Sequence, residues 1–525
     1  MGDHEDLPMM IWKTALAAAV SLLFAASALA AAPTARTETG VVRGVTTGEV
    51  SAYLGLPYAA PPIGPLRWRP PQPAKPWSSL RPATSFAPAC LQTGVSMPGE
   101  TPPKTSEDCL YLNVWAPAHP PEGGAAVIVW IHGGGYANGA TAMPLYAGDR
   151  LARKGVVVVS LAYRLGPLGF LAHPALSAEG GGTSGNYGLM DQIAALEWVH
   201  RNIAAFGGDP GNVTIAGQSA GAMSVSLLMA SPRAKGLFQR AIGQSGGVFE
   251  PLQLAPGYQL PQAEKDGVGY AASVGAKSLA DLRALPAERL LGGGTGKVTH
   301  PVIEPAVLPR SPYDAFVAGR QNSVPILVGY NAEEARSLAD VSKVSAATFA
   351  ADLSRAWGPL PPGIVAAYPF TTDDEARHAR IALETDLRFG WDMWAWARLQ
   401  AKAGQPVYFY RFDRAPPFPA GTRAGWGASH FAELWYMFDQ LDQEPWAWTP
   451  ADRRLADAMS SYWVNFARTG NPNGQNLPSW PAFTLAQGNM LSLGDSIVAS
   501  QPPVPAPIQA FDATYGAVRG KPFGR

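Results

Sequence analysis

The sequence predicts an α/β protein built on one central, mostly parallel sheet flanked by helices. Five runs of residues are apolar enough to be buried on both faces of a sheet, as strands of a parallel sheet are. They occupy residues 125–131, 155–163, 212–217, 324–330 and 406–412. Segments with the apolar spacing of helices lie between them, and this alternation is typical of the α/β class.

The clearest helix is predicted over residues 189–206. Four apolar residues recur in it at helical spacing: Ile193, Leu196, Val199 and Ile203. The sequence GGDP that follows is a strong stop signal for a helix. Residues 335–403 also show helical patterns with interspersed charges, and we expect them to cap the sheet as an insertion rather than form a separate domain.

The composition indicates a folded chain with a large core. Of the 525 residues, 47% are hydrophobic and only 15% are charged. Forty basic residues balance forty acidic ones, and no Lys/Arg cluster stands out, so we expect no nucleic-acid partner. A neutral small molecule is the simplest ligand to expect. Because no repeat or low-complexity segment divides residues 31–525, we interpret them as one domain.

The N-terminus has the pattern of an export signal over residues 1–30. Lys13 precedes the apolar run TALAAAVSLLFAASALA, which is too short for a comfortable membrane span, and Ala28-Leu29-Ala30 supplies the small residues that signal peptidase needs. We predict cleavage before Ala31, a secreted or periplasmic protein, and no stable membrane span after cleavage. The acidic start MGDHEDLP is unusual for a signal, so translation can also begin at Met9 or Met10.

Only two cysteines occur in the chain, Cys90 and Cys109. In an oxidising compartment two lone cysteines at this spacing can close one loop, which is worth about 3 kcal/mol in the chain-entropy model. The alternative is a pair of unpaired buried thiols. The sequence contains no CxxC motif and no Cys/His cluster, so it does not support a structural zinc site.

Two segments present a serine in the pattern GxSxG: GQSAG at 217–221 and GQSGG at 243–247. This pattern exposes a nucleophilic serine where it forms a strained turn between a strand and a helix. Ser219 has both flanking elements, because NVTIA precedes it and AMSVSLLMAS follows with helical spacing. Ser245 has only the strand, because Pro251 follows within six residues. Ser219 is therefore the predicted nucleophile, and a structural role is favoured for Ser245.

A glycine-rich loop is the predicted oxyanion hole. The strand at 125–131 runs directly into His132-Gly133-Gly134-Gly135-Tyr136, where the glycines let backbone N–H groups turn toward a developing oxyanion. The proposed donors are the N–H groups of Gly133, Gly134 and Ala220.

The general base follows from the order Ser, acid, His that this kind of site has along the chain. Five of the eight histidines precede Ser219, which leaves His300, His378 and His430. His378 lies in DDEARHAR, which resembles a solvated helix face, and His300 precedes any carboxylate at a strand end. His430, in the loop segment GWGASHFAEL, is the best candidate.

The acid that orients this histidine should follow the strand at 324–330, where the sequence continues as Asn331-Ala332-Glu333-Glu334. Side chains of neighbouring residues at a strand end point in different directions, so only one of the two glutamates can reach the histidine. From the residues alone, either Glu333 or Glu334 is the acid.

With these motifs in this order, the chain resembles the type-B carboxylesterases, the branch of the α/β-hydrolases that includes the cholinesterases. The resemblance runs from about residue 37 to residue 485. It also includes YLGLPYAAPPIGPLRWRPP at 53–71, EDCLYLNVWAP at 107–117, GNYGLMDQIAALEWVHRNIAAFGGDPGNVTIAGQSAGA at 185–222 and WVNFARTGNPN at 463–473. It implies an α/β-hydrolase fold with helical insertions capping the active site, and hydrolysis of carboxylic esters through an acyl-enzyme without metal or cofactor.

The resemblance also implies roles for individual residues. Ser219 resembles the family's nucleophile, Glu334 its acid and His430 its base, while Ser245 resembles a second serine that supports the triad by hydrogen bonding. Gly133, Gly134 and Ala220 resemble the family's oxyanion hole. Cys90 and Cys109 resemble its N-terminal disulfide.

Four positions depart from the family pattern. Ala335 and Phe431 stand where the family usually has glycine, Ala432 where it often has aspartate, and Ala162 where it has asparagine. None of them removes a reacting group. Two other functions stay open: a specialist hydrolase of amide, polyester or toxin esters on the same fold, and a non-catalytic binding homologue. The intact Ser219, Glu334 and His430 argue against the second.

Overall fold

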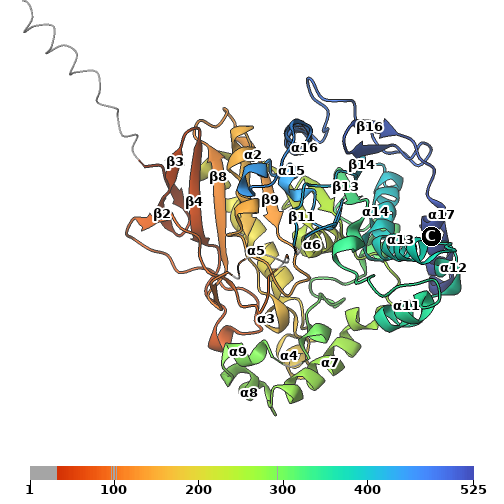
Figure 1. Cartoon of the computed structure of the whole chain (residues 1–525). Helices are drawn as coiled ribbons and strands as arrows, with labels where there is room; N and C mark the ends of the chain where they lie inside the picture. The colour runs from red at the N-terminus through yellow and green to blue at the C-terminus, as the bar shows by residue number, and fades with distance from the viewer. Residues whose placement is uncertain (1–31, 96, 98–100, 102, 293, 422) are drawn as a thin grey trace, which may run out of the picture.

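The structure is a computed structural model that describes residues 32–95, 97, 101, 103–292, 294–421 and 423–525. The predicted signal peptide, residues 1–30, lies outside the described residues. A large sheet crosses the molecule with helices packed against it (Figure 1). In the described part of the chain, no helix is long and apolar enough to span a bilayer.

Within these described residues, the main sheet has eleven strands. Their bounds are β3 Val45–Thr47, β4 Val50–Pro57, β8 Tyr111–Pro117, β9 Ala125–Ile131, β10 Val157–Leu161, β11 Gly208–Gln218, β12 Arg240–Gln244, β13 Ile326–Asn331, β14 Val407–Phe412, β15 Met490–Leu493 and β16 Ile497–Ser500. The order is β16-β15-β14-β13-β12-β11-β9-β10-β8-β4-β3. Pairing is parallel from β10 to β15 and antiparallel at both edges, as the sequence predicts for a mostly parallel sheet.

In the described part of the N-terminal region, two small sheets accompany the main one. The first pairs β1 Thr34–Thr37, β2 Gly40–Arg43 and β5 Arg81–Pro82, and the second pairs β6 Ala89–Cys90 with β7 Thr105–Ser106.

The helices alternate with the strands along most of the chain. The α-helices are α2 Asp149–Arg153, α3 Gly166–Phe170, α4 Pro174–Glu179, α5 Tyr187–Asn202, α6 Ala220–Ala230, α7 Leu260–Ser273, α8 Leu279–Ala284, α9 Ala287–Leu290, α10 Pro312–Val317, α11 Phe349–Trp357, α12 Pro362–Val365, α13 Asp373–Thr385, α14 Trp391–Lys402, α15 Leu434–Met437, α16 Pro450–Thr469 and α17 Ala506–Arg519. The 3-10 helices are η1 Gly64–Leu66, η2 Pro144–Tyr146, η3 Ile203–Phe206, η4 Pro232–Ala234, η5 Pro256–Tyr258, η6 Thr295–Val298, η7 Glu334–Ser337 and η9 Leu441–Gln443, and the π-helix is η8 Asp386–Gly390.

The sheet separates two hydrophobic clusters, which explains why its strands are apolar on both faces. In β9, Val127, Val129 and Ile131 belong to the cluster that includes residues of α5, α6 and α14. The alternate residues Ile128 and Trp130 belong to a second cluster with α15 and α16. Successive side chains of a strand point to opposite faces, so β9 is covered by helices on each side.

The predicted elements are confirmed with small shifts at their ends. The five apolar runs form β9, β10, β11, β13 and β14. The predicted helix at 189–206 is α5 followed by η3, and it ends at Gly207, whose positive φ of 79° suits glycine. The segment 335–403 is largely helical, from η7 through α14, and α14 packs against β13 and β14.

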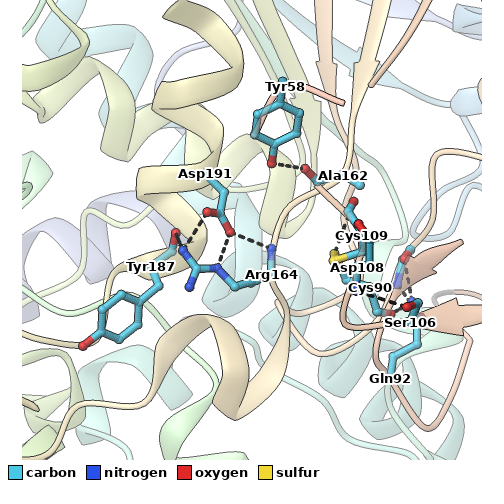
Figure 2. The surroundings of a disulfide bond; sticks show 11 residues. Tyr58, Cys90, Gln92, Ser106, Asp108, Cys109, Ala162, Arg164, Tyr187 and Asp191 are labelled. Carbon is cyan, nitrogen blue, oxygen red and sulfur yellow. Dashed lines mark hydrogen bonds and ion pairs between the residues drawn. A yellow bond between two sulfur atoms is a disulfide. The ribbon is translucent and has the colours of Figure 1, made fainter. Parts of the chain in front are cut away.

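The predicted disulfide between Cys90 and Cys109 is present, and polar contacts fix the chain around it (Figure 2). Beyond it, the Arg164 guanidinium forms a buried bidentate ion pair with Asp191 of α5, with N–O distances of 2.7 and 2.8 Å. Ala162 stands where the family has asparagine. Its backbone carbonyl accepts a hydrogen bond from the Tyr58 hydroxyl at 2.7 Å, and this bond anchors the residue. Residues that follow β10 are thereby tied to both the N-terminal region and α5.

The strand order reverses between β9 and β11, because β10 lies on one side of β9 and β11 on the other. In open α/β sheets, ligands bind at such a switch point, outside the carboxyl ends of the strands. Gly133 follows β9 and Ser219 follows β11. The fold therefore places the two predicted reactive segments side by side at the position where a ligand is expected.

Candidate active site

Ser219 lies on a sharp turn between β11 and α6, as the sequence predicts. Its backbone has φ 56° and ψ −126°, which is strained for a residue with a side chain. Small neighbours permit the turn, because a Cβ on Gly217 would lie 2.4 Å from the carbonyl carbon of Gly221. A Cβ on Gly221 would lie 2.0 Å from the carbonyl oxygen of Ile131. Only glycines allow strand, turn and helix to approach this closely.

The predicted oxyanion loop packs directly against this turn. A Cβ on Gly133 would lie 2.7 Å from the Gln218 carbonyl oxygen and 3.0 Å from the Cβ of Ser219. Gly134 has φ 106°, a conformation that disfavours other residues. Among the described residues, neither Gly133 nor Gly134 donates its backbone N–H to a protein acceptor. Ala220 is the first residue of α6, and the first N–H groups of a helix have no acceptor within it.

His132, which opens this loop, is a buried support rather than a base. Its ring stacks on Tyr163 with ring centroids 4.6 Å apart, and the Tyr163 hydroxyl donates to the His132 carbonyl at 2.9 Å. Burial lowers the pKa of His132 to about 4. The side chain is therefore neutral at physiological pH, and it holds the start of the loop by packing.

The structure brings His430 and Glu334 together. Nδ1 of His430 lies 2.6 Å from Oε2 of Glu334, and both side chains are buried. The other carboxylate oxygen of Glu334 accepts the backbone N–H of Asn331 at 2.6 Å. A carboxylate at Nδ1 selects the tautomer whose Nε2 is free to accept a proton.

Glu333 points elsewhere, so the geometry separates the two adjacent glutamates. Its Oε1 accepts hydrogen bonds from the guanidinium of Arg336, and its Oε2 accepts the backbone N–H of Ala428 at 3.3 Å. The side chain is about one-third exposed. Glu333 thus closes the turn of η7 against the loop before His430, while Glu334 reaches the imidazole.

Gln218, the residue before Ser219, also contacts the histidine and was not singled out by the sequence. Its Nε2 lies 3.3 Å from both ring nitrogens of His430. Within the described part of the chain, no hydrogen bond joins the Ser219 hydroxyl to His430. Because Gln218 directly precedes Ser219 in the chain, its contact with the imidazole places His430 near the serine turn. The only available sequence signal was the position of Gln218 inside the GxSxG motif.

A second buried carboxyl, Glu433, lies behind the pair. It accepts hydrogen bonds from Asn331 Nδ2 at 2.6 Å and from Gln244 Nε2 at 3.2 Å. Burial, together with the nearby carboxylate of Glu334, raises the pKa of Glu433 to about 8. Glu433 is therefore mainly protonated at pH 7. Trp463 completes the network by donating to Oε1 of Gln244 at 2.9 Å.

Ser245 follows β12 on the strand next to Ser219 and is fully buried. In the part of the chain that the structure describes, its hydroxyl has no hydrogen-bond partner. The supporting hydrogen bond to the triad that the resemblance implies is therefore not seen. The adjacent Gly246 packs against the site, since a Cβ there would lie 2.3 Å from the Ser219 carbonyl oxygen.

Two of the departures from the family pattern differ in their consequence. Ala335 lies in η7 without a positive φ, and its N–H donates to Thr385 Oγ1 at 3.2 Å, so alanine fits there without strain. Phe431 has φ 73°, in the left-handed region that favours glycine. A bulky side chain at that position is strained, and it lies directly after His430.

The disulfide loop supports the oxyanion loop from outside. Gln92, which lies two residues after Cys90, donates Nε2 to the Gly139 carbonyl at 2.7 Å and accepts the Gly139 N–H at 2.8 Å. A Cβ on Gly139 would lie 2.1 Å from Nδ1 of His132. Gly139, which follows the oxyanion loop, is thus held by hydrogen bonds to Gln92 and by close packing against the His132 ring.

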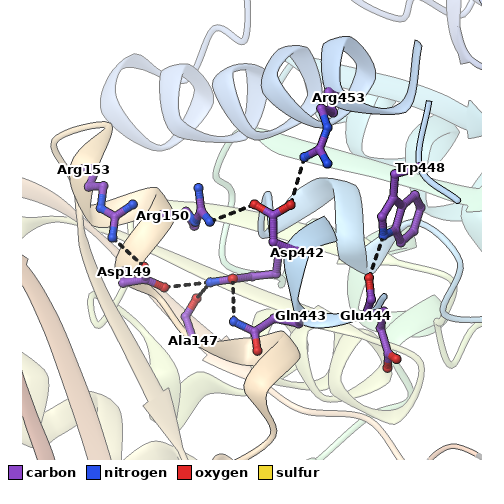
Figure 3. Close-up of polar contacts among 10 residues, drawn as sticks. Ala147, Asp149, Arg150, Arg153, Asp442, Gln443, Glu444, Trp448 and Arg453 are labelled. Atoms are coloured by element: carbon purple, nitrogen blue, oxygen red, sulfur yellow. Dashed lines mark hydrogen bonds and ion pairs between the residues drawn. The ribbon is translucent and has the colours of Figure 1, made fainter. Parts of the chain in front are cut away.

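A cavity of about 660 Å³ lies beside Gln92 and Gly139. Its lining includes Gln92, Gly139, Met143, Trp435 and Gln443, but neither Ser219 nor His430. Figure 3 shows polar contacts around Asp149, Asp442 and Gln443, the last of which lines the cavity. Gln440 donates to the Ala147 carbonyl at 2.9 Å and to Asp149 Oδ1 at 2.7 Å. These contacts fasten the segment after the oxyanion loop to the segment after His430.

The comparisons with known proteins agree on one family. The carboxylesterase family model matches residues 31–356 and 365–505. The chain is 38% identical over 479 residues to the fumonisin B1 esterase of Sphingopyxis macrogoltabida, covering 88% of this chain and 86% of that protein. It is 36% identical over 490 residues to the para-nitrobenzyl esterase of Bacillus subtilis (strain 168), covering 89% and 96%.

Solved structures give the same result. The chain superimposes on a thermophilic PNB esterase with a TM-score of 0.80 and 34% identity, covering 91% of this chain and 99% of that one. A second PNB esterase structure gives a TM-score of 0.78 at 35% identity. The chain belongs to the carboxylesterase family, and it is a carboxylic ester hydrolase with the α/β-hydrolase fold.

Proposed function

We propose that the protein hydrolyses carboxylic esters through an acyl-enzyme, with Ser219 as nucleophile, His430 as general base and Glu334 as the orienting acid. The observation that carries the proposal is the short contact between His430 Nδ1 and Glu334 Oε2, close to a serine on a strained turn. A buried imidazole held in this tautomer, next to a serine with a helix behind it, supports acyl transfer.

In the first half of the reaction, Ser219 Oγ forms a bond to the ester carbonyl carbon while its proton passes to Nε2 of His430. The carbonyl oxygen becomes an oxyanion, which the backbone N–H groups of Gly133, Gly134 and Ala220 are proposed to stabilise. The bond to the alcohol oxygen then breaks, and the imidazolium gives its proton to that oxygen. The product of this half is free alcohol and an ester of Ser219.

The second half repeats the same steps with water. The imidazole takes a proton from water as the water oxygen attacks the acyl carbon, and the bond to Ser219 Oγ breaks as the serine regains its proton. The acid leaves, and the enzyme returns to its starting state. Glu334 accepts the hydrogen bond from Nδ1–H in both halves and so stabilises the imidazolium.

Rapid-mixing kinetics on a nitrophenyl ester test this proposal. An acyl-enzyme pathway predicts a burst of nitrophenol equal to the enzyme concentration when deacylation is slower than acylation. Ser219→Ala and His430→Ala should each abolish the burst and the steady-state rate. Retention of either the burst or the steady-state rate in either variant would show that another group attacks the ester.

The substrate class is proposed only as a neutral small-molecule ester. The 38% identity to a fumonisin B1 esterase and the 36% identity to a para-nitrobenzyl esterase favour a fumonisin-type ester and a simple benzyl ester almost equally. A specialist hydrolase of a toxin ester is therefore the second candidate. Comparing kcat/KM for short-chain and long-chain acyl esters with that for fumonisin B1 decides between them. A preference above about 100-fold for fumonisin B1 supports the specialist, since this exceeds the discrimination that one methylene typically gives.

We also propose that residues 1–30 direct export and that residues 31–525 form one secreted or periplasmic domain. The support is the signal pattern in the sequence together with the Cys90–Cys109 disulfide, which is typical of oxidising compartments. N-terminal sequencing of the exported protein should give Ala31 as the first residue. A mature protein that begins at Met1, Met9 or Met10 would contradict the cleavage.

A further inference from the structure

Two phenylalanine rings contact the imidazole of His430. The ring of Phe389 stacks on it almost in parallel, with ring centroids 4.5 Å apart and an angle of 8° between the planes. The ring of Phe431 lies 4.3 Å away at 59°. All three side chains are buried. The family resemblance assigned no role to either phenylalanine, and the mechanism above uses neither.

Phe389 is presented by an irregular turn of helix. It lies in η8, a π-helical segment that joins α13 to α14, and π-helical turns frequently occur at functional sites. The turn is tightly built, since a Cβ on Gly390 would lie 2.3 Å from Oδ1 of Asp386. Asp386 is anchored in turn by the Tyr368 hydroxyl, which donates to it at 2.7 Å. The extra residue in this turn directs the Phe389 ring onto the histidine.

Phe431 occupies a position where the backbone favours glycine. Its φ of 73° is strained for a residue that bears a side chain. Such strain persists only where the surroundings hold it, and it is often found at functional sites. The ring of Phe431 packs in the hydrophobic cluster that includes α15 and α16, and it also contacts His430.

The proposed mechanism gives this contact a chemical meaning, because His430 becomes a cation in the transition state of both half-reactions. A cation over the face of an aromatic ring is attracted by the ring quadrupole, more strongly when the site is desolvated. We propose that Phe389 is a positioning residue that stabilises the His430 imidazolium by a cation–π contact, with Phe431 as a second aromatic contact. This inference rests on the proposed role of His430 as the base.

Other groups near the imidazole can titrate, and the test must separate them from it. Glu334 contacts the ring from η7, and Glu433 lies one turn further along its own segment. On η8, Asp386 accepts from Tyr368, and burial raises its pKa to about 6. The charge of Arg388, next to Phe389 in the chain, is paired with the carboxylate of Glu384 at 2.7 Å. Asp386 is thus the group whose titration could be mistaken for that of the base.

Fluorinated phenylalanines at position 389 provide the test, because fluorine withdraws electron density from the ring face and changes its shape little. Enzymes with phenylalanine, 4-fluoro-, 3,5-difluoro- and 3,4,5-trifluorophenylalanine at position 389 would be compared on one nitrophenyl ester. We expect kcat to fall stepwise, by about fivefold to thirtyfold at the trifluoro analogue. The acid limb of the kcat/KM profile should move by about one pH unit toward lower pH, since the imidazolium loses stabilisation.

The matched control is the same series at Phe409, a buried ring on β14 that packs edge-on against Trp394. That series should leave kcat and the acid limb unchanged. Melting temperatures of all proteins exclude a loss of folded enzyme, and an Asp386→Asn variant should keep the acid limb of the parent. If the limb follows Asp386 instead, the pH readout does not report His430 and the inference is wrong.

The remaining outcomes also decide the question. A flat series at Phe389, or a fall in kcat without movement of the acid limb, means that the ring only packs, and this overturns the inference. An equal fall at Phe409 has the same consequence. Ser219→Ala and His430→Ala, measured alongside, report on the proposed function: if both are inactive and the fluorine series is flat, only the cation–π role fails.

Discussion

Ser219 and Ser245 lie at the ends of two neighbouring parallel strands and have nearly the same backbone φ angle. Their φ angles are 56° and 55°. Gln218 pairs with Gln244 in the sheet, so each serine follows directly after a paired glutamine. The amide of Ser219 donates to the Gln244 carbonyl at 2.9 Å, and that of Ser245 donates to the Gly329 carbonyl at 2.8 Å.

The two serines differ in what surrounds this shared turn. Ser219 is 9% exposed and precedes α6, and its neighbour Gln218 contacts His430. Ser245 is 0% exposed and is followed by irregular chain, and Gln244 before it belongs to the Glu433 network. A strained turn at a strand end therefore does not make a nucleophile. Access, a following helix and a nearby base are needed as well.

The largest predicted effect is that of Ser219→Ala. Removing a nucleophile from a triad costs about 10⁶-fold in kcat in serine hydrolases where it has been done. We expect a loss of that order here, with the melting temperature unchanged within a few degrees. Steady-state hydrolysis of a nitrophenyl ester measures the first, and calorimetry measures the second.

The next effect separates the adjacent glutamates. Glu334→Gln should lower kcat by about three to four orders of magnitude, because the amide cannot hold the required tautomer of His430 as a carboxylate does. Glu333→Gln, the matched control, should cost less than about tenfold, because Glu333 binds Arg336 and the backbone of Ala428. A greater loss in the Glu333 variant would mean that the turn of η7 presents the other side chain to the histidine.

A smaller effect, on the pH dependence of stability, is predicted for Glu433→Gln. Glu433 binds Gln244, the residue before Ser245. Because burial raises the pKa of Glu433 to about 8, the folded protein keeps this carboxyl protonated while the unfolded chain ionises it above about pH 4.5. The unfolded state then binds fewer protons, so this group lowers the stability of the folded protein as pH rises from about 5 to 8. The glutamine variant should lack this contribution.

Urea unfolding at several pH values measures that contribution. Between pH 5 and pH 8, the difference in unfolding free energy, variant minus wild type, should increase. A constant difference would show that Glu433 is ionised in the folded protein, and the network around Gln244 would then be held by charge.

The smallest effect is predicted for Ser245→Ala. Since its hydroxyl is buried with no partner among the described residues, removing it should cost less than about tenfold in kcat. A loss approaching that of Ser219→Ala would mean that the hydroxyl forms a hydrogen bond during the reaction that this structure does not contain.

The sequence predicted most of what depends on local pattern. Long apolar runs identified the strands, and the strand and helix around Ser219 distinguished it from Ser245. The choice between Glu333 and Glu334 needed the structure, because the residues alone do not fix the turn of η7. The family spacing favoured Glu334, and the contact with His430 agrees with it.

Contacts that depend on tertiary approach were missed. Phe389 is 41 positions before His430 and is directed onto it by a π-helical turn that has no recognisable sequence signal. The Glu433 network joins side chains from β12, β13 and α16. The sequence did flag Phe431 as a departure, but its strained backbone and its ring contact became clear only from the fold.

Covalent labelling most directly tests the central claim that Ser219, and not Ser245, is the nucleophile. The wild-type protein would be treated with an organophosphate, digested and mapped by mass spectrometry. The account predicts one phosphoryl group per chain, on the peptide containing Ser219, with activity lost in proportion to labelling, and no labelling of the Ser219→Ala variant. A phosphoryl group on Ser245, or stoichiometric labelling of the Ser219→Ala variant, would contradict it.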